Sequence, residues 1–347
     1  MKNALFLLTV VLITLSSCTS RPTNQYRFKL TELDTGVNES LRGLYVVDEN
    51  VIWASGTKGT YLVSNNGGRS WRVGTVALAK ENDFRSIHAW DENRAMVFGV
   101  TGPVFGYTTE DGGDSWTLVY EDNRDVVFFN SLKFADSTNG IALSDPVEGR
   151  FFVLRTTDGG TSWLTVEDLP QANDGEVNFA SSNSCIEYLP SGKAWFVTGG
   201  STARVFYSID FGKSWQVADT PLVHGQTSTG IFSVAFKNDT EGIIVGGNYK
   251  EPDLNKNIAA TSMDGGVTWQ PSETMPRGFR SCVQHVSAPN INIYVAVGKS
   301  GCDYSADNGS SWRNITNQGY FTCRVVPGQT SLFVAGSKGR IAKIELK

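Results

Sequence analysis

The sequence has no excess of basic residues and little helical patterning. Thirty Lys and Arg stand against 35 Asp and Glu, for a formal net charge of −5, and no run of Lys and Arg could follow a phosphate backbone. Nucleic acid is therefore not an expected partner. Leu-rich stretches of helical period are scarce, whereas the chain has 36 Gly, 9 Trp and 19 Phe. This balance predicts an all-β protein of short strands and tight turns.

Signals for metals and cofactors are also missing. The three histidines, His88, His224 and His285, lack the spacing of metal ligands. No Gly-x-Gly-x-x-Gly motif precedes a helical segment, so the sequence offers no dinucleotide site. We expect no cofactor and no metal, and no catalytic residues can be assigned from spacing alone.

One apolar run, residues 4–15 after Lys2, is too short to span a bilayer comfortably and predicts an export signal over residues 1–17. It ends in Leu-Ser-Ser-Cys at Cys18, which resembles the bacterial lipobox and implies a lipid on this thiol. An ordinary signal followed by a chance Cys is the alternative. Residues 18–25 are expected to form a polar tether. The resemblance implies a membrane-anchored protein of the bacterial cell envelope, and the outer membrane by default because no Asp follows Cys18.

An eight-residue pattern occurs six times along the rest of the chain. Its shared letters are Ser/Thr-x-Asp/Asn-x-Gly-x-Ser/Thr-Trp, and successive tryptophans are 45, 47, 52, 54 and 43 residues apart. The six tryptophans are Trp71, Trp116, Trp163, Trp215, Trp269 and Trp312. A period of this size fits one four-stranded propeller blade per repeat.

Each shared letter suits a tight turn. A carboxylate can accept backbone N–H groups across its own turn, Gly supplies a positive φ, and hydroxyl groups close side-chain-to-backbone bonds. The pattern resembles the Asp box, or BNR repeat, of sialidases, some endoglucanases, sortilin-type receptors and the photosystem II assembly factor propellers. That resemblance implies a structural role for the carboxylates rather than catalysis or calcium binding. These residues are Asp111, Asp158, Asp210, Asp264 and Asp307.

The number of blades follows from the segments outside the six boxes. Residues 334–339, Val-Ala-Gly-Ser-Lys-Gly, parallel residues 53–59 of the first repeat and predict that a seventh blade begins there. The chain stops before a seventh box, but residues 26–33 alternate as an isolated strand at the other end. We therefore expect a seven-bladed β-propeller over residues 26–347, in which the N-terminal strand closes the last blade.

The candidate site lies at the start of the inner strands, because function in such propellers usually sits on that face. Counting back fourteen residues from the Gly, or the Ser in the third blade, that ends each second strand gives the strand starts Arg42, Arg85, Asn130, Cys185, Phe232 and Thr322. Arg280 fits the same position if the first hairpin of the sixth blade is four residues longer. With Arg324 close by, the arginines predict an electropositive ring suited to carboxylates. Three lysines from equivalent loops, Lys58, Lys299 and Lys338, add to it. Alternatively, each Arg pairs with a carboxylate or stacks on an aromatic ring.

Three insertions on the same face, residues 145–150, 168–184 and 248–257, predict walls or lids around the site, and surface insertions without a function are the alternative. The chain most resembles the assembly-factor type of Asp-box propeller. We expect a monomeric, non-enzymatic binding or assembly scaffold that grips an acidic segment of an envelope protein or an anionic glycan.

The alternative function is an exo-acting glycosidase of sialidase type, a family that also uses an arginine triad. Its Phe/Tyr-Arg-Ile-Pro signature is only half matched by Phe-Arg-Ser-Ile at residues 84–87. Tyr249, Tyr320, Glu187 and Asp145 could supply its nucleophile and acid, but their spacing does not select them. The balance leans away from an enzyme.

The remaining cysteines, Cys185, Cys282, Cys302 and Cys323, are expected to be free thiols packed as small apolar residues. Cys282 and Cys323 fall on neighbouring inner strands, so they are the first candidates if any disulfide forms.

Overall fold

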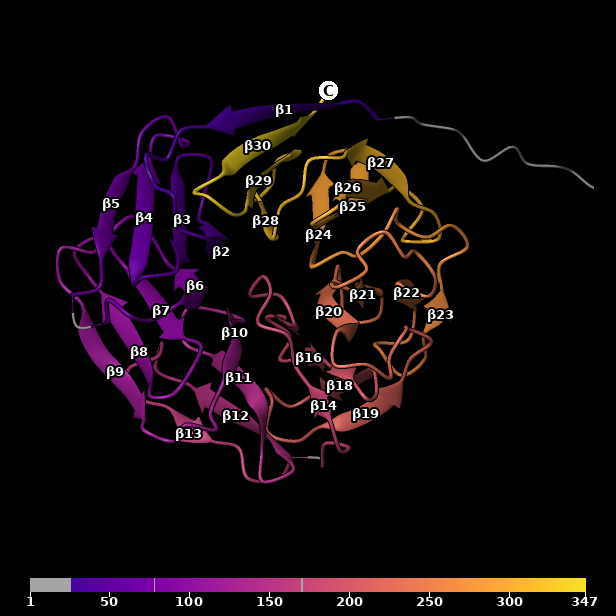
Figure 1. Cartoon of the computed structure of the whole chain (residues 1–347), viewed down its shortest axis with the longest axis horizontal. Helices are drawn as coiled ribbons and strands as arrows, with labels where there is room; N and C mark the ends of the chain where they lie inside the picture. The colour runs from indigo at the N-terminus through magenta and orange to yellow at the C-terminus, as the bar shows by residue number, and fades with distance from the viewer. Residues whose placement is uncertain (1–25, 78, 170) are drawn as a thin grey trace, which may run out of the picture.

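The computed structural model describes residues 26–77, 79–169 and 171–347, and the regular elements in these ranges are all β-strands. They form seven sheets around a central axis, which confirms the predicted all-β propeller of seven blades (Figure 1). No helix in these ranges is long and apolar enough to cross a membrane. The predicted signal peptide at 1–17, the tether at 18–25 and the lipidation site Cys18 lie outside the described residues.

The first three blades are antiparallel sheets in which strand order follows the chain from the inside of the ring outwards. Blade 1 contains β2 (Leu41–Val46), β3 (Val51–Gly56), β4 (Thr60–Asn65) and β5 (Arg72–Thr75). Blade 2 contains β6 (Phe84–Ala89), β7 (Ala95–Gly99), β8 (Val104–Thr109) and β9 (Thr117–Asp122). Blade 3 contains β10 (Phe129–Phe134), β11 (Gly140–Val147), β12 (Arg150–Thr156) and β13 (Leu164–Thr165).

The remaining blades follow the same plan. Blade 4 contains β15 (Ile186–Tyr188), β16 (Ala194–Val197), β18 (Arg204–Ser208) and β19 (Gln216–Asp219). Blade 5 contains β20 (Thr229–Phe236), β21 (Gly242–Asn248), β22 (Ala259–Ser262) and β23 (Gln270–Pro271). Blade 6 contains β24 (Cys282–Ala288), β25 (Ile291–Gly298), β26 (Gly301–Ser305) and β27 (Arg313–Thr316). Blade 7 contains β28 (Thr322–Val325), β29 (Ser331–Ala335), β30 (Ile341–Leu346) and β1 (Phe28–Leu33).

The N-terminal strand seals the ring as predicted. β1 runs antiparallel to β30, from Phe28 opposite Leu346 to Leu33 opposite Ile341, so residues from both ends of the chain complete blade 7. The hydroxyl of Thr35, just after β1, donates to the carbonyl of Gly339 at 2.7 Å. The edge of β30 is thereby paired instead of exposed.

Two short strands attach the longest insertion to the ring. β14 (Glu176–Val177) pairs with β17 (Gly199–Gly200), and β17 pairs with β20 of blade 5 through Gly199 opposite Gly230. A Cβ atom on Gly230 would lie 2.2 Å from the Cα atom of Gly199, and the φ of Gly230 is +146°. Only glycine allows this close approach, which fixes where the insertion enters the channel.

Apolar side chains fill the spaces between blades. Phe333 of blade 7 shares one buried cluster with Leu44 and Ile52 of blade 1, which joins the last blade to the first. Trp163 at the end of the third repeat meets Phe98 of the preceding blade, with ring centroids 5.2 Å apart. Contacts of this kind explain why a tryptophan recurs in each of the first six blades, since a buried aromatic ring contributes roughly 3 kcal/mol or more.

The repeated turns use their carboxylates as predicted. In the second repeat, Asp111 Oδ1 accepts from the backbone N–H of Ser115 at 2.9 Å, and Oδ2 accepts from the Ser115 hydroxyl at 2.6 Å. These bonds hold the pKa of Asp111 at about 2, with the Ser115 hydroxyl as the largest cause. The same pair of bonds occurs at Asp158, Asp210, Asp264 and Asp307. The carboxylates are therefore engaged within their own turns.

Candidate functional site

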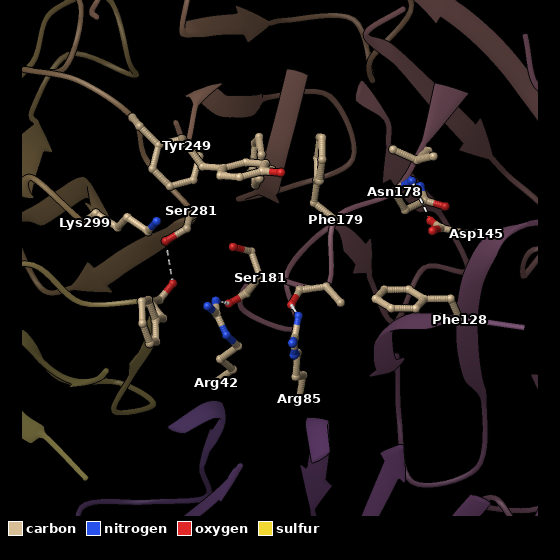
Figure 2. Close-up of a pocket in the computed structure, with 15 residues that line it drawn as sticks. Arg42, Arg85, Phe128, Asp145, Asn178, Phe179, Ser181, Tyr249, Ser281 and Lys299 are labelled. Carbon is tan, nitrogen blue, oxygen red and sulfur yellow. Dashed lines mark hydrogen bonds between the residues drawn. The ribbon is translucent and has the colours of Figure 1, made fainter. Parts of the chain in front are cut away.

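A pocket of about 400 Å³ opens at one end of the central channel, where the inner strands of six blades begin (Figure 2). All three predicted insertions contribute to its walls. The lining residues are Arg42, Arg85, Phe128, Asp145, Val177, Asn178, Phe179, Ala180, Ser181, Phe232, Tyr249, Phe279, Ser281, Lys299 and Phe321. A pocket of this volume, with apolar walls and a few polar groups, has the dimensions of a ligand site.

The floor of the pocket is a loop that crosses the channel, residues 178–184, which we call the central loop. It connects β14 to β15, and its rose-coloured trace reaches the middle of the ring in Figure 1. Four successive carbonyl groups of this loop accept hydrogen bonds from arginine side chains of blades 1, 2 and 7. The pairs are Arg85 to Ala180 (3.1 Å), Arg42 to Ser181 (3.1 Å), and Arg324 to Ser182 (3.0 Å) and Asn183 (2.7 Å).

The side chain of Asn183 binds the central loop to the inner strands of blades 2 and 3. Its Nδ2 donates to the carbonyl of Ile87 at 2.9 Å, and its Oδ1 accepts from the backbone N–H of Leu132 at 2.7 Å. The hydroxyl of Ser182 donates to the carbonyl of Ser281 at 2.7 Å. Hydrogen bonds to blades 1, 2, 3, 6 and 7 thus hold one loop at the axis.

The structure brings only part of the predicted electropositive ring to the pocket. Arg42, Arg85 and Lys299 line it. Arg324 lies on the other side of the central loop and lines a separate cavity with His88. The arginines therefore do not form one open ring, because a loop of the same chain occupies the axis and accepts their hydrogen bonds.

The other predicted site residues do not line the pocket. Arg280 is fully buried, and its Nε donates to Asp303 Oδ2 at 2.8 Å in an ion pair. Asn130 is also fully buried, although its side chain contacts a pocket residue, as described below. Lys58 is exposed and lies 3.6 Å from Glu39, and Lys338 is exposed as well.

The two pocket arginines make the contacts of the alternative interpretation, in which each Arg stacks on an aromatic ring or pairs with a carboxylate. The Arg42 guanidinium stacks on Phe321, 4.0 Å from the ring centroid, and Arg85 Nε donates to Asp83 at 2.7 Å. Burial, and then the neighbouring Arg85, lowers the pKa of Arg42 to about 10, so the group stays charged at neutral pH. Each guanidinium is pre-oriented by its contacts, and each has further N–H donors.

Aromatic rings make up much of the remaining wall. Phe179 of the central loop stacks on Phe232, with centroids 3.8 Å apart and an interplanar angle of 4°. Lys299 Nζ lies 5.7 Å from the centroid of Tyr249 and forms no ion pair with a described residue. Analysis of the sequence did not identify this aromatic wall. Phe279 and Phe321 directly precede two of the aligned strand starts, and this recurrence was the available signal.

Asp145 is the only carboxyl group among the described residues that line the pocket. Its Oδ1 accepts from the backbone N–H of Asn178 and from Asn130 Nδ2, both at 2.9 Å. Burial nevertheless raises the pKa of Asp145 to about 6, because these two neutral donors offset only part of the lost hydration. From the sequence, Asp145 was predicted only as one of several candidates for the catalytic residues of a glycosidase.

Of the other residues considered for a glycosidase, Tyr320 and Glu187 are engaged away from the pocket. Tyr320 donates to Glu32 at 2.8 Å, and Glu187 lies 2.8 Å from Lys133 in an ion pair. Tyr249 lines the pocket without a carboxylate partner among the described residues. No group of three or more His, Cys, Asp and Glu side chains that could hold a metal occurs in the described part of the chain.

Cys282 and Cys323 meet below the central loop as free thiols. Their sulfur atoms are 3.6 Å apart, and Arg324 Nη1 lies 3.5 Å from Cys282 Sγ. The predicted proximity is therefore present without a bond, and all four described cysteines are buried free thiols.

Comparisons with known proteins identify propellers that are similar to this chain. No protein-family model matches the chain. The photosystem II assembly lipoprotein Ycf48 of Synechococcus sp. (strain CC9902) is 26% identical over 226 residues, which are 65% of this chain and 59% of that protein. The photosystem II assembly protein Ycf48 of Synechococcus sp. (strain JA-2-3B'a(2-13)) is 23% identical, over 66% of this chain and 74% of its own length.

A solved structure described as YCF48 bound to D1 peptide has a TM-score of 0.64 and 15% identity, and the match covers 92% of this chain and 97% of that one. The chain is therefore a seven-bladed β-propeller that is similar in sequence and fold to the Ycf48 assembly proteins.

Proposed function

We propose that this protein is a non-enzymatic binding scaffold that takes an acidic segment of a partner protein into the pocket above the central loop. The observation that carries the proposal is the combination of Arg42, Arg85 and Lys299 with aromatic walls in one preformed pocket. Guanidinium groups bind carboxylates with good geometry, and aromatic rings supply apolar area for neighbouring side chains. The similar Ycf48 structure, described as bound to a D1 peptide, supports a peptide as the ligand.

Two of the loop lysines, Lys299 and Lys338, offer a matched test of where the ligand binds. Lys299 lines the pocket, whereas the equivalent Lys338 is exposed outside it. We expect Lys299→Ala to weaken binding of a capped Glu-rich peptide by about three- to tenfold, the range of one charge-assisted contact, as measured by isothermal titration calorimetry. Lys338→Ala should leave the affinity unchanged, and a matched Gln-rich peptide should bind weakly to all three proteins.

Equal losses in the two lysine variants would mean that the peptide senses only net charge, and would refute the pocket as its site. If polygalacturonate binds and none of the peptides does, the ligand class is instead an anionic glycan. The glycosidase alternative has no observation in its favour, since Asp145 has no second carboxyl group beside it among the described pocket residues.

We also propose that a lipid on Cys18 anchors the propeller in the outer membrane, through the tether at 18–25. The support is the lipobox-like sequence that ends at Cys18. Metabolic labelling with palmitate should mark the wild-type protein and not Cys18→Ala. Label that persists in the variant would show that the protein is exported without this anchor.

A further inference from the structure

At one end of the pocket, two oxygen atoms receive no hydrogen bond from a described residue: Asp145 Oδ2 and Asn178 Oδ1. Asp145 Oδ1 has two donors, but none of the described residues donates to its Oδ2. Asn178 is 3% exposed and lines the pocket beside Asp145; its Nδ2 donates to Val197, while its Oδ1 has no partner (Figure 2). The Oδ1 of the buried Asn130, whose Nδ2 contacts Asp145, is also without a partner.

Such a cluster destabilises the folded protein when it stands alone. A buried acceptor without a donor, such as Asn178 Oδ1, costs about 1–3 kcal/mol, and a cation would offset the hydration that the partly buried Asp145 carboxylate loses. None of the described residues forms an ion pair with Asp145. The pKa of Asp145, raised to about 6, reflects the same loss of hydration. Donors on a bound cation would satisfy the carboxylate and Asn178 Oδ1 together.

We propose that Asp145 and Asn178 form a subsite for the ammonium or guanidinium group of a bound segment. This inference rests on the proposed function, because it assigns the second end of the same pocket. Figure 2 shows Asp145 on one side of the pocket and Lys299 on the other, with Arg42 and Arg85 between them. The pocket therefore selects a segment that carries a basic side chain as well as a carboxylate.

The geometry favours an organic cation over a metal ion. A hard metal ion takes six to eight oxygen ligands, whereas only two side-chain groups of this subsite line the pocket. Phe128 is held next to the carboxylate, since the backbone N–H of Asp145 donates to its carbonyl at 3.0 Å. Its ring lines the pocket and can support a planar or alkylammonium cation.

The test is a thermodynamic cycle between Asp145 and the base of the ligand. The probes are capped peptides with one Glu and one Lys separated by one to five Ala, in both orders. In a matched set, norleucine replaces Lys and keeps the alkyl chain without the charge. Binding to the wild type, Asp145→Asn, Lys299→Ala and the control Asp174→Asn is measured by isothermal titration calorimetry. Asp174 is an exposed residue of the same insertion as the central loop.

We expect the best Lys peptide to bind the wild type and Asp174→Asn about tenfold more tightly than its norleucine partner, as for a close charge pair. In Asp145→Asn this preference should fall to about twofold or less, while Lys299→Ala should retain it. Absence of the preference in the wild type, or its survival in Asp145→Asn, would overturn the subsite.

The same data separate failure of the subsite from failure of the proposed function. Norleucine peptides that bind equally well, and lose affinity in Lys299→Ala, would remove the subsite and leave the acidic-segment site standing. No binding by any peptide would remove both. Thermal stabilisation of the wild type but not Asp145→Asn by calcium chloride would overturn the organic cation in favour of a metal site.

Discussion

Replacing Asp145 by Asn should stabilise the protein at neutral pH, and the gain should disappear in acid. Burial raises the pKa of this carboxyl group from 3.8 to about 6. A pKa raised on folding means that the folded state binds the proton more tightly than the unfolded chain does. The contribution of Asp145 to stability is therefore fully present below pH 3.8 and is lost as pH rises through about 6.

The size of the effect follows from the difference between the two pKa values. One pKa unit corresponds to about 1.4 kcal/mol, so ionised Asp145 costs the folded state about 2–3 kcal/mol above pH 6. Asn keeps the acceptor for Asn178 N–H and Asn130 Nδ2, and its own amide can donate to the unpartnered oxygen of Asn178. Asp145→Asn removes the ionisation without removing the hydrogen bonds.

Urea unfolding at pH 4, 6 and 8 measures this difference directly. We expect Asp145→Asn to exceed the wild type by about 2–3 kcal/mol at pH 8, by less at pH 6 and by little at pH 4. The exposed Asp174→Asn should follow the wild-type curve at each pH. An Asp145→Asn protein that is no more stable at pH 8, or a gain that persists unchanged at pH 4, would refute the reasoning.

Three further predictions concern the scaffold. Arg280→Ala leaves Asp303, which is 1% exposed, without a cation, and it should lower the free energy of unfolding in urea by about 3–5 kcal/mol. The double variant Arg280→Met with Asp303→Leu should lower it by less, and equal losses would contradict the ion-pair explanation. Deleting residues 26–33 should replace the single calorimetric transition with a broad one, because β30 loses its partner, and an unchanged melting profile would count against the closure. Gly230→Ala should lower the urea midpoint by an amount equivalent to at least about 2 kcal/mol, since its Cβ would lie 2.2 Å from Gly199; a wild-type midpoint would show that the two strands can separate at no cost.

The repeat period predicted the architecture because each of the first six blades places one tryptophan just after the turn that follows its third strand, so the spacing of the tryptophans gives the length of a blade. The terminal strand was predictable for a similar reason, since residues 26–33 alternate and lack a blade of their own. Both features depend on local patterns repeated at fixed distances.

The site was less predictable because its geometry depends on contacts between blades. The insertion at 168–184 was identified as a wall, but nothing in its sequence shows that four of its carbonyls meet Arg42, Arg85 and Arg324 at the axis. Likewise, Arg280 shares its aligned position with Arg85, and only the fold places Asp303, on the third strand of the same blade, against it. Alignment of strand starts therefore identified the face on which the pocket opens, and overestimated the number of cations that line it.

The shared blade has a consequence for how the chain is made. β1 is synthesised among the first elements, but β30 follows it by some three hundred residues, as the contact between Thr35 and Gly339 illustrates. During synthesis the early strand must remain unpaired until the end of the polypeptide has been made, which delays final assembly and exposes intermediates to proteolysis. A product that ends before β30 would keep six complete blades but leave the ring open, with β1 unpaired. Chaperones and proteases that recognise unpaired strands could therefore distinguish it from the complete protein.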